Sequence, residues 1–433
     1  MSPIPCENLR QQFGKSALGP IFAAFAHLLI TSARTENVHR LAFVARDGEF
    51  LREVTATYLA ASGSGFKPVL DYVHLSRIST NLLRHDHFGM AALAEANFVR
   101  AGTLTLRSFL GFFGLDRPAV VEYFNAHSLD PDTPLTSSTT IESLFENSYF
   151  QNLVAQIRTQ QKFYLQQYLT DAQMLDNPEC AFVDIGWRGS ILSAIQLLRE
   201  SKSSTQLRAY YLGHWGDHLP LPETGANIKG MLADYRRGKN LREGAAYHLS
   251  LPLEAICRAA HGSVMHYEVG ATGSINCVLN TEPALLAHES ANALWRAPIR
   301  QGILDAVEEA ARTSVFSENI SSEHIRKKAQ NQLLRLAFFP RSDEIDAVSG
   351  LLHSEGHNAA WHTPLVATNR PSPIFSPRIW LAGLTSPWRS GYIAATGGYP
   401  LATFHFMLEA FLLAAPPATR ENLKNFALRL RRM

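Results

Sequence analysis

The chain has 433 residues, of which 46% are hydrophobic and 18% are charged, a composition typical of a globular protein and not of a disordered or fibrous one. At roughly 100–200 residues per domain, this length predicts enough core for two or three domains. Forty basic residues against 38 acidic residues leave a net charge of +2, so bulk charge gives no reason to expect a nucleic-acid partner or a membrane-surface protein.

The start of the chain and its cysteines predict a cytoplasmic protein. The opening residues MSPIPCENLRQQ contain no basic stretch followed by an apolar core, so they are unlike a signal peptide. The longest apolar run, 21–30, is about half of the roughly 20 residues that a membrane-spanning helix needs, and we expect no membrane span. Four widely spaced cysteines without a CxxC pair indicate free thiols in a reducing compartment, with zinc or disulfides as the alternative: Cys6, Cys180, Cys257 and Cys277.

Residues 1–84 are predicted to form the first part of an α/β core. A helix is expected over 18–37, because Pro20 suits the first turn of a helix and an apolar pattern follows it. Residues 39–61 are typical of a strand, a tight turn and a helix. A Gly/Ser loop then leads to a second strand at DYVHLSR, 71–77.

The middle of the chain interrupts this core and then resumes it. Residues 85–175 have a helical, charged pattern, which predicts a helical insertion. Residues 176–280 form the second part of the core, with a strand, a turn and a helix at 180–198 and a strand at 207–216. Strands that alternate with helices predict a parallel sheet.

Residues 281–433 are predicted to be a mostly helical C-terminal region. Proline and glycine recur through 367–400, which predicts a long loop there.

Three of the expected strands end in polar residues. In an open α/β sheet, ligands bind at the carboxyl ends of the strands, so we expect these residues to meet in one crevice. They are Arg46, Asp47 and Gly48 after LAFVA; Ser76 and Arg77 after DYVHL; and Asp184, Gly186, Trp187, Arg188, Gly189 and Ser190 in DIGWRGS.

The residue types in these turns suit phosphate. A glycine turn between a strand and a helix leaves backbone N–H groups open to an anion, and Gly48, Gly189 and Ser190 occupy such turns. Guanidinium groups can add bidentate hydrogen bonds to phosphate oxygens, and the arginines in the turns are Arg46, Arg77 and Arg188.

The two aspartates need a different role, because a carboxylate does not face phosphate without a metal between them. We expect Asp47 and Asp184 to accept hydrogen bonds from sugar hydroxyls or to hold Mg²⁺. An aspartate directly after a buried strand is costly unless it is used, so DIGWRGS is the most specific of the three turns. Taken alone, ARDG is equally well a turn with a surface ion pair, and LSR carries little information.

Five segments together resemble a family of bacterial polysaccharide-cluster proteins. In many members, this region follows a haloacid-dehalogenase-type phosphatase domain. The resemblance covers most of residues 15–270 and continues more faintly through the helical tail. The segments are PIFAAFAHLL, RLAFVARDGEFL, YVHLSR, FVDIGWRGSI and LEAICRAAHGSV.

The same turns are similar, more loosely, to the site of type I phosphoribosyltransferases. VARDGEFL is similar to the pyrophosphate loop, and FVDIGWRGS to the loop that holds the ribose and 5-phosphate of phosphoribosyl pyrophosphate. Two departures are visible: Ile185 follows Asp184 where two adjacent acids are usual, and Thr-Gly-x-Thr is reduced to Gly189 and Ser190.

These resemblances imply a type I phosphoribosyltransferase-like (Rossmann-like) fold with a parallel sheet. They imply a glycosyltransferase that moves a 5-phosphoribosyl group from phosphoribosyl pyrophosphate onto a glycan hydroxyl, in the biosynthesis of ribofuranose-containing bacterial surface polysaccharide. A partner phosphatase would then remove the 5-phosphate.

Catalytic roles follow from this chemistry. Displacing pyrophosphate from a ribosyl carbon builds an oxocarbenium-like charge on the ring. Mg²⁺, Arg46 and backbone amides would hold the leaving pyrophosphate, while Asp184 stabilises the ring through its hydroxyls. Glu254 and His261, in the resembling segment LEAICRAAHGS, are candidates for orienting or deprotonating the acceptor. The alternatives are a surface or capping carboxylate at 254 and a structural histidine at 261.

Three short motifs carry less weight. LDPDTP (129–134) resembles the start of a phosphatase site, but it follows a helical-looking stretch and its prolines mark a turn, so we expect no phosphatase activity here. ATGGYP (395–400) has no strand before it and predicts a glycine turn. HSEGHN (353–358) has no context that supplies a third metal ligand.

Two other functions stay open at this point. One is a transferase or hydrolase that uses another phosphorylated sugar or a nucleotide-sugar, and the other is a non-catalytic scaffold of a polysaccharide assembly. A lipid-linked acceptor would bring a cytoplasmic enzyme to the periphery of the inner membrane without a spanning segment.

Overall fold

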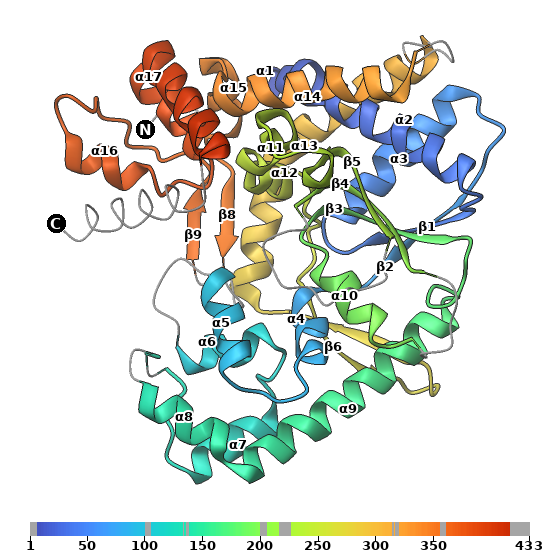
Figure 1. Ribbon diagram of the computed structural model, residues 1–433, viewed down its shortest axis with the longest axis vertical. Coiled ribbons are helices and arrows are strands. Elements are labelled where there is room, and N and C mark those ends of the chain that lie inside the picture. The colour runs from blue at the N-terminus through green and yellow to red at the C-terminus, as the bar shows by residue number, and fades with distance from the viewer. Residues whose placement is uncertain are drawn as a thin grey trace.

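The computed structural model describes residues 7–99, 105–132, 134–135, 138–199, 206–215, 227–313, 316, 320–355 and 361–415. Its centre is a five-stranded sheet in which every neighbouring pair of strands is parallel (Figure 1). The predicted parallel α/β core is therefore confirmed, and its fifth strand is an addition to the prediction. The strands are β1 Arg40–Val44, β2 Val69–Val73, β3 Cys180–Trp187, β4 Arg208–His214 and β5 Asn227–Asp234.

The order of the strands places a switch point in the middle of the sheet. The order is β2-β1-β3-β4-β5, so the chain leaves β1 first toward one edge and later, through β3, toward the other. In doubly wound sheets, the crevice outside the carboxyl ends of the two strands at the switch point is the usual ligand site. The fold therefore directs attention to the ends of β1 and β3.

Helices cover both faces of the sheet, as the alternation along β1 requires. Leu41 and Phe43 pack into one hydrophobic core, and Ala42 and Val44 pack into another on the opposite face. The first core is covered by α2 Gly19–Thr35, α3 Gly48–Ser62, α13 Pro283–Arg312 and α14 Ser322–Phe338. The second is covered by α9 Ser148–Asp171, α10 Ser190–Gln196 and the hairpin of β6 Val264–Val269 and β7 Ile275–Leu279.

The N-terminal helix is longer than the sequence indicated. Pro20 lies in the first turn of α2 as predicted, but α1 (Glu7–Phe13) and a π-helical turn, η1 (Gly14–Leu18), precede α2 without a break. Within the described residues, Glu7–Thr35 is the one helical stretch long and apolar enough to span a membrane, and 72% of its most apolar window is buried inside the protein. Gly14 and Gly302 let this stretch approach α13 closely, since a Cβ at either position would lie 2.0 Å from a backbone oxygen of the other helix. The stretch packs as a core helix.

The chain between β2 and β3 is helical, as predicted for residues 85–175, and part of it has an aromatic core of its own. This helical segment begins after the short α4 (Arg77–Thr80) and η2 (Asn81–Arg84) and lies below the sheet in Figure 1. Phe88, Phe109 and Phe113 pack edge-on or tilted against one another with ring centroids 5.1–5.6 Å apart. Besides α9, the helices of this segment are α5 Met90–Val99, α6 Leu106–Phe112, α7 Pro118–Ala126 and α8 Ser138–Glu146.

The C-terminal region is mostly helical, as predicted, but the long loop expected at 367–400 is wrong in part. Two helices begin inside this range, at Pro377 and at Arg389. Pro377 occupies the first turn of the first helix, where the missing N–H of a proline costs nothing. The glycine turn predicted at ATGGYP is a kink: Gly398, with φ 59°, divides the second helix. The remaining elements are α11 Leu241–His248, η3 Tyr235–Arg237, α12 Ser250–Cys257, α15 Ser342–Val348, β8 Leu352–Glu355, β9 Trp361–Pro364, α16 Pro377–Gly383 and α17 Arg389–Ala414.

Candidate active site

A cleft of about 450 Å³ opens at the carboxyl ends of β1 and β3, where the switch point lies. Most of the residues that the sequence assigned to a site line this cleft, so the structure brings the three predicted turns together. These residues are Arg46, Asp47, Ser76, Arg77, Asp184, Gly186, Trp187, Arg188, Gly189, Ser190 and Glu254.

Two predicted site residues do not line the cleft. Gly48 lies at the start of α3, and a Cβ there would be 2.8 Å from the carbonyl carbon of Phe43, so its small size lets α3 begin tightly against β1. The ring of His261 is bonded elsewhere: its Nδ1 donates to the Gly262 carbonyl at 2.8 Å, and its Nε2 accepts from the Tyr72 hydroxyl at 2.6 Å. Gly48 therefore packs against β1 and His261 is hydrogen-bonded to Tyr72 of β2, and neither residue faces the cleft.

The sequence suggested that Asp184 follows a strand, but Asp184 lies inside β3. The strand continues to Trp187, and Asp184 pairs in register with Tyr211 of β4. Gly186 makes this extension possible: its φ is +126°, and a Cβ there would lie 2.1 Å from the Gly213 oxygen on β4. The carboxylate is thereby buried at the floor of the cleft.

The carboxylates of the cleft repel one another. Burial, followed by the charge of Glu254, raises the pKa of Asp47 to about 6. Burial, followed by the charge of Asp47, raises the pKa of Asp184 well above its ordinary value, even though the Ile185 N–H donates to it at 2.8 Å. Such a group favours a bound cation or positive charge. Among the described residues, no cluster of three or more His, Cys, Asp or Glu side chains has the arrangement of a metal site.

Arginines from distant parts of the chain balance these acids. Arg46, Arg77, Arg188 and Arg258 all line the cleft. Glu289 on α13 is fully buried, and one of its carboxylate oxygens lies 3.1 Å from Arg46 and 3.6 Å from Arg258. Its other oxygen lies 3.5 Å from Arg296. Glu289 therefore fixes two of the four cleft guanidinium groups.

Arg77 differs from the others because it is exposed and, as far as the described residues extend, its guanidinium makes no hydrogen bond or ion pair. Its backbone is held firmly, since the Ser76 hydroxyl caps α4 by accepting from the Ser79 N–H at 3.1 Å. The Ser76 hydroxyl also donates to the Val264 oxygen at 2.5 Å. Ser76 thus positions the turn, and Arg77 is left available to an anion.

His353 and Glu289 are site residues that the sequence analysis missed. His353 comes from β8 and lines the cleft, where burial and then the charge of Arg258 lower its pKa to about 3. A neutral histidine among arginines adds a polar wall without adding charge. In the sequence, His353 drew attention only as the first residue of HSEGHN (353–358), a possible metal motif. Residues 356–358 of that motif lie outside the described part of the chain.

An aromatic wall forms the other side of the cleft. Trp187 and Trp215 stack in parallel, with centroids 4.4 Å apart, and Tyr247 stands edge-on to Trp215 at 5.1 Å. The Trp187 indole N–H donates to Glu254 at 2.7 Å and so fixes one carboxylate oxygen at the boundary between the charged and aromatic sides. Of the three rings, Tyr247 is the exposed one, at 54%.

Comparisons with known proteins add nothing to this geometry. A scan against models of protein families finds no match, and a search of curated proteins finds none either. The fold class and the cleft define an α/β protein with a cleft lined by arginines and carboxylates at the switch point of its sheet.

Proposed function

We propose that the protein is a glycosyltransferase with a type I phosphoribosyltransferase-like core. It transfers a 5-phosphoribosyl group from phosphoribosyl pyrophosphate to a hydroxyl of a glycan. The observation that carries the proposal is the meeting of buried carboxylates and four arginines in one cleft at the switch point of the sheet. The resemblance of the sequence to a polysaccharide-cluster family supports it.

The arginines supply the donor site. Pyrophosphate and a 5-phosphate are the most highly charged parts of this donor, and guanidinium groups bind such oxygens in pairs. Arg46 and Arg258 are pre-oriented by Glu289, while Arg77 is free to turn toward the ligand. A fixed pair would hold the leaving pyrophosphate without reorganisation, which favours the transition state over the ground state.

Asp184 acts on the ribose. Its carboxylate lies at the floor of the cleft and would accept hydrogen bonds from the ring hydroxyls. As the bond between C1 and the pyrophosphate oxygen weakens, positive charge develops on the ring, and a buried carboxylate beside it stabilises that charge.

Asp47 and Asp184 fit a magnesium ion shared with the donor. Burial, together with the charge of a neighbouring carboxylate, raises the pKa of each aspartate, and a cation would relieve this repulsion. Mg²⁺ is usually held by one or two carboxylates together with substrate phosphate oxygens. When bound, Mg²⁺ supplies charge neutralisation of the leaving pyrophosphate.

Glu254 receives the proton of the acceptor. One of its oxygens is fixed by Trp187, so the carboxylate is oriented at the edge of the aromatic side of the cleft. In the transfer, the acceptor oxygen forms a bond to C1, the bond between C1 and pyrophosphate breaks, and the proton of the hydroxyl passes to Glu254. The acceptor is a glycan of bacterial surface polysaccharide, and a partner phosphatase later removes the 5-phosphate. We place the enzyme in the cytoplasm.

Thermal unfolding tests the proposal directly. With Mg²⁺ present, phosphoribosyl pyrophosphate should raise the melting temperature more than ribose 5-phosphate or pyrophosphate does, because it fills both the phosphate and the ribose parts of the site. The shift is measurable, since a ligand at a hundredfold excess over its Kd stabilises the fold by about 2.7 kcal/mol. Asp184→Asn should fold and lose this shift. Asp171→Asn, at the exposed end of α9, is the matched control and should keep it.

Other outcomes would overturn the proposal in distinguishable ways. A shift given only by a nucleotide-sugar would make the donor a different activated sugar. No shift with any of these ligands, in a protein that melts cooperatively, would favour a scaffold without catalytic activity.

A further inference from the structure

Large apolar side chains are exposed unusually densely on the C-terminal helices. Half of those exposed in the described part of the chain lie between residues 374 and 411. Monomeric soluble proteins rarely expose apolar side chains in such concentration unless the surface binds something. We call this surface the C-terminal apolar face and define it by Ile374, Phe375, Leu381, Phe404, Met407 and Phe411.

The face has two parts of different shape. Ile374 and Phe375 are neighbours in the turn before α16 and are 82% and 86% exposed, so they form an apolar tip. Phe404, Met407 and Phe411 follow helical spacing along α17 and form one outer stripe. The Trp380 indole N–H donates to the Thr396 hydroxyl at 2.8 Å and so ties α16 to α17.

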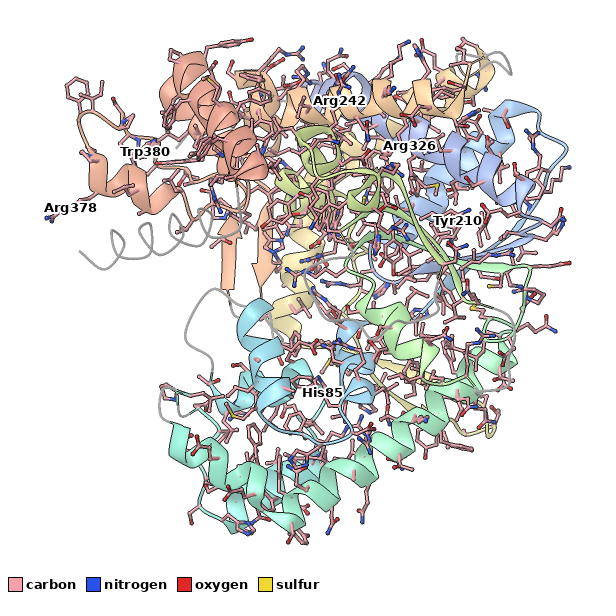
Figure 2. The ribbon with its side chains drawn as sticks, viewed as in Figure 1. His85, Tyr210, Arg242, Arg326, Arg378 and Trp380 are labelled. Atoms are coloured by element: carbon pink, nitrogen blue, oxygen red, sulfur yellow. The ribbon has the colours of Figure 1, made fainter. Side chains whose placement is uncertain are left out.

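In the same region, basic residues outnumber acidic ones. Residues 361–415, the last range of the chain that the structure describes, contain three basic residues and one acidic residue, a net of +2, which equals the net charge of the whole chain. The one acid in this range is Glu409, and it lies 3.5 Å from His405. Arg378 projects from α16 at the outer edge of the molecule (Figure 2), and no hydrogen bond or ion pair to another described residue engages it.

We propose that the C-terminal apolar face binds the anionic surface of a lipid bilayer. Bulky apolar side chains that enter the boundary between headgroups and acyl chains, beside arginines that contact anionic headgroups, are the two components of interfacial binding. A second copy of the chain fits the face less well, because a symmetric dimer would bring two positively charged regions together.

This surface goes beyond the proposed function and does not depend on it. The two are connected in space, because His353 on β8 lines the cleft, β8 pairs with β9, and the carbonyl of Leu365 just after β9 accepts from the backbone N–H of Trp388 just before α17 at 2.7 Å.

Vesicle binding tests the proposal with the full-length protein. Vesicles of phosphatidylcholine mixed with phosphatidylglycerol should sediment the protein, and vesicles of phosphatidylcholine alone should sediment much less. The double variant Ile374→Ser, Phe375→Ser should bind the mixed vesicles about tenfold or more weakly, since it removes two inserted side chains. Arg378→Gln should lower binding to the mixed vesicles about fivefold and leave binding to phosphatidylcholine alone unchanged.

A matched control and a second measurement make the outcome decisive. The control Tyr149→Ser, Phe163→Ser removes side chains that are 65% and 61% exposed on α9, and it should bind like the unaltered protein. Equal binding to both vesicle types, or unchanged binding by the Ile374/Phe375 variant, would overturn the proposal. So would a concentration-dependent dimer, seen by analytical ultracentrifugation, that this variant abolishes. The donor-induced melting shift is read separately, so failure of the membrane surface and failure of the proposed transferase remain distinguishable.

Discussion

Glu289 is the residue on which the charged side of the cleft depends. Its carboxylate is fully buried, and the guanidinium groups of Arg46, Arg258 and Arg296 lie 3.1–3.6 Å from it. A buried charge is tolerated only when it is paired, so loss of this one acid would leave three arginines without their shared partner.

We expect Glu289→Gln to lower the free energy of unfolding by about 3 kcal/mol, the cost of breaking a buried ion pair from one side. Glu308→Gln on the same helix is the control: Glu308 pairs with Arg312 at the surface, and its loss should cost less than about 0.5 kcal/mol. Urea denaturation of both variants measures the difference. If the two variants were equally stable, the cluster would not contribute to the fold.

Some residues of the site could be predicted from the sequence, and others, Glu289 among them, could not. Asp47 and Asp184 were predictable because each comes at or near the end of an apolar strand, where a charge needs a reason. Glu289 and His353 give no such signal. A glutamate in a charged helix has the pattern of a solvent-exposed residue, and only the packing of α13 against the cleft shows that it is buried.

At the scale of elements, the junction of α11, α14 and α17 should respond to acid. His248 on α11 lies against Phe338 on α14, with ring centroids 4.6 Å apart, and 6.1 Å from the ring of His405 on α17. Burial lowers the pKa of His248 from 6.5 to about 4; Glu409 opposes the shift, and His405 and Arg389 add to it. The folded state thus holds this histidine neutral.

The sign of the pH dependence follows from that pKa. The unfolded chain binds a proton at His248 below pH 6.5, whereas the folded chain binds one only near pH 4. Above pH 6.5 the titration of His248 therefore does not affect the free energy of unfolding, and as the pH falls from 6.5 toward 4 that free energy decreases. At pH 5, the loss should be about 2 kcal/mol. Burial raises the pKa of Glu409, but the hydrogen bond with His405 and the positive charges around it together lower that pKa below its ordinary value, so its contribution declines only at lower pH.

Denaturation at pH 7 and at pH 5 measures this effect. The unaltered protein should lose about 2 kcal/mol more over this interval than His248→Gln does. His324→Gln, at an exposed position on α14, should behave like the unaltered protein. An identical pH dependence in His248→Gln would mean that His248 is not held neutral.

Elements were predicted well where one local signal decided them, and poorly where two signals competed. The strands β1, β3 and β4 were expected close to where they lie, and Pro20 correctly marked a helix start. The strand β2 was expected at 71–77 but lies at Val69–Val73, and Arg77 begins a helix instead. The loop predicted at 367–400 failed because proline favours both a turn and the first turn of a helix. Pro377 has the second role, which the sequence pattern did not distinguish.

At the scale of the whole molecule, distant parts of the chain share one core. Apolar residues of α2 and α3 lie in the same cluster as Ile299, Ile303 and Val307 of α13 and Leu333 of α14. The approach is close, since a Cβ at Gly19 would lie 2.3 Å from the Cβ of Ala306. Sequence composition divides the chain at about residue 280, but it carries no information about which helices meet across that division.

The shared core predicts the outcome of a truncation. A chain ended after residue 280 retains all five strands of the sheet and loses α13 and α14, so the apolar surfaces of α2 and α3 would face water. Burial of apolar surface is the main favourable contribution to folding, so this fragment should unfold without cooperativity, bind a hydrophobic dye and lose its near-ultraviolet circular dichroism. Co-expression of 281–433 as a separate chain should restore cooperative unfolding, because the missing helices would then be supplied in trans. A fragment 1–280 that melts cooperatively with full near-ultraviolet dichroism would show instead that the sheet and its N-terminal helices fold as an independent unit.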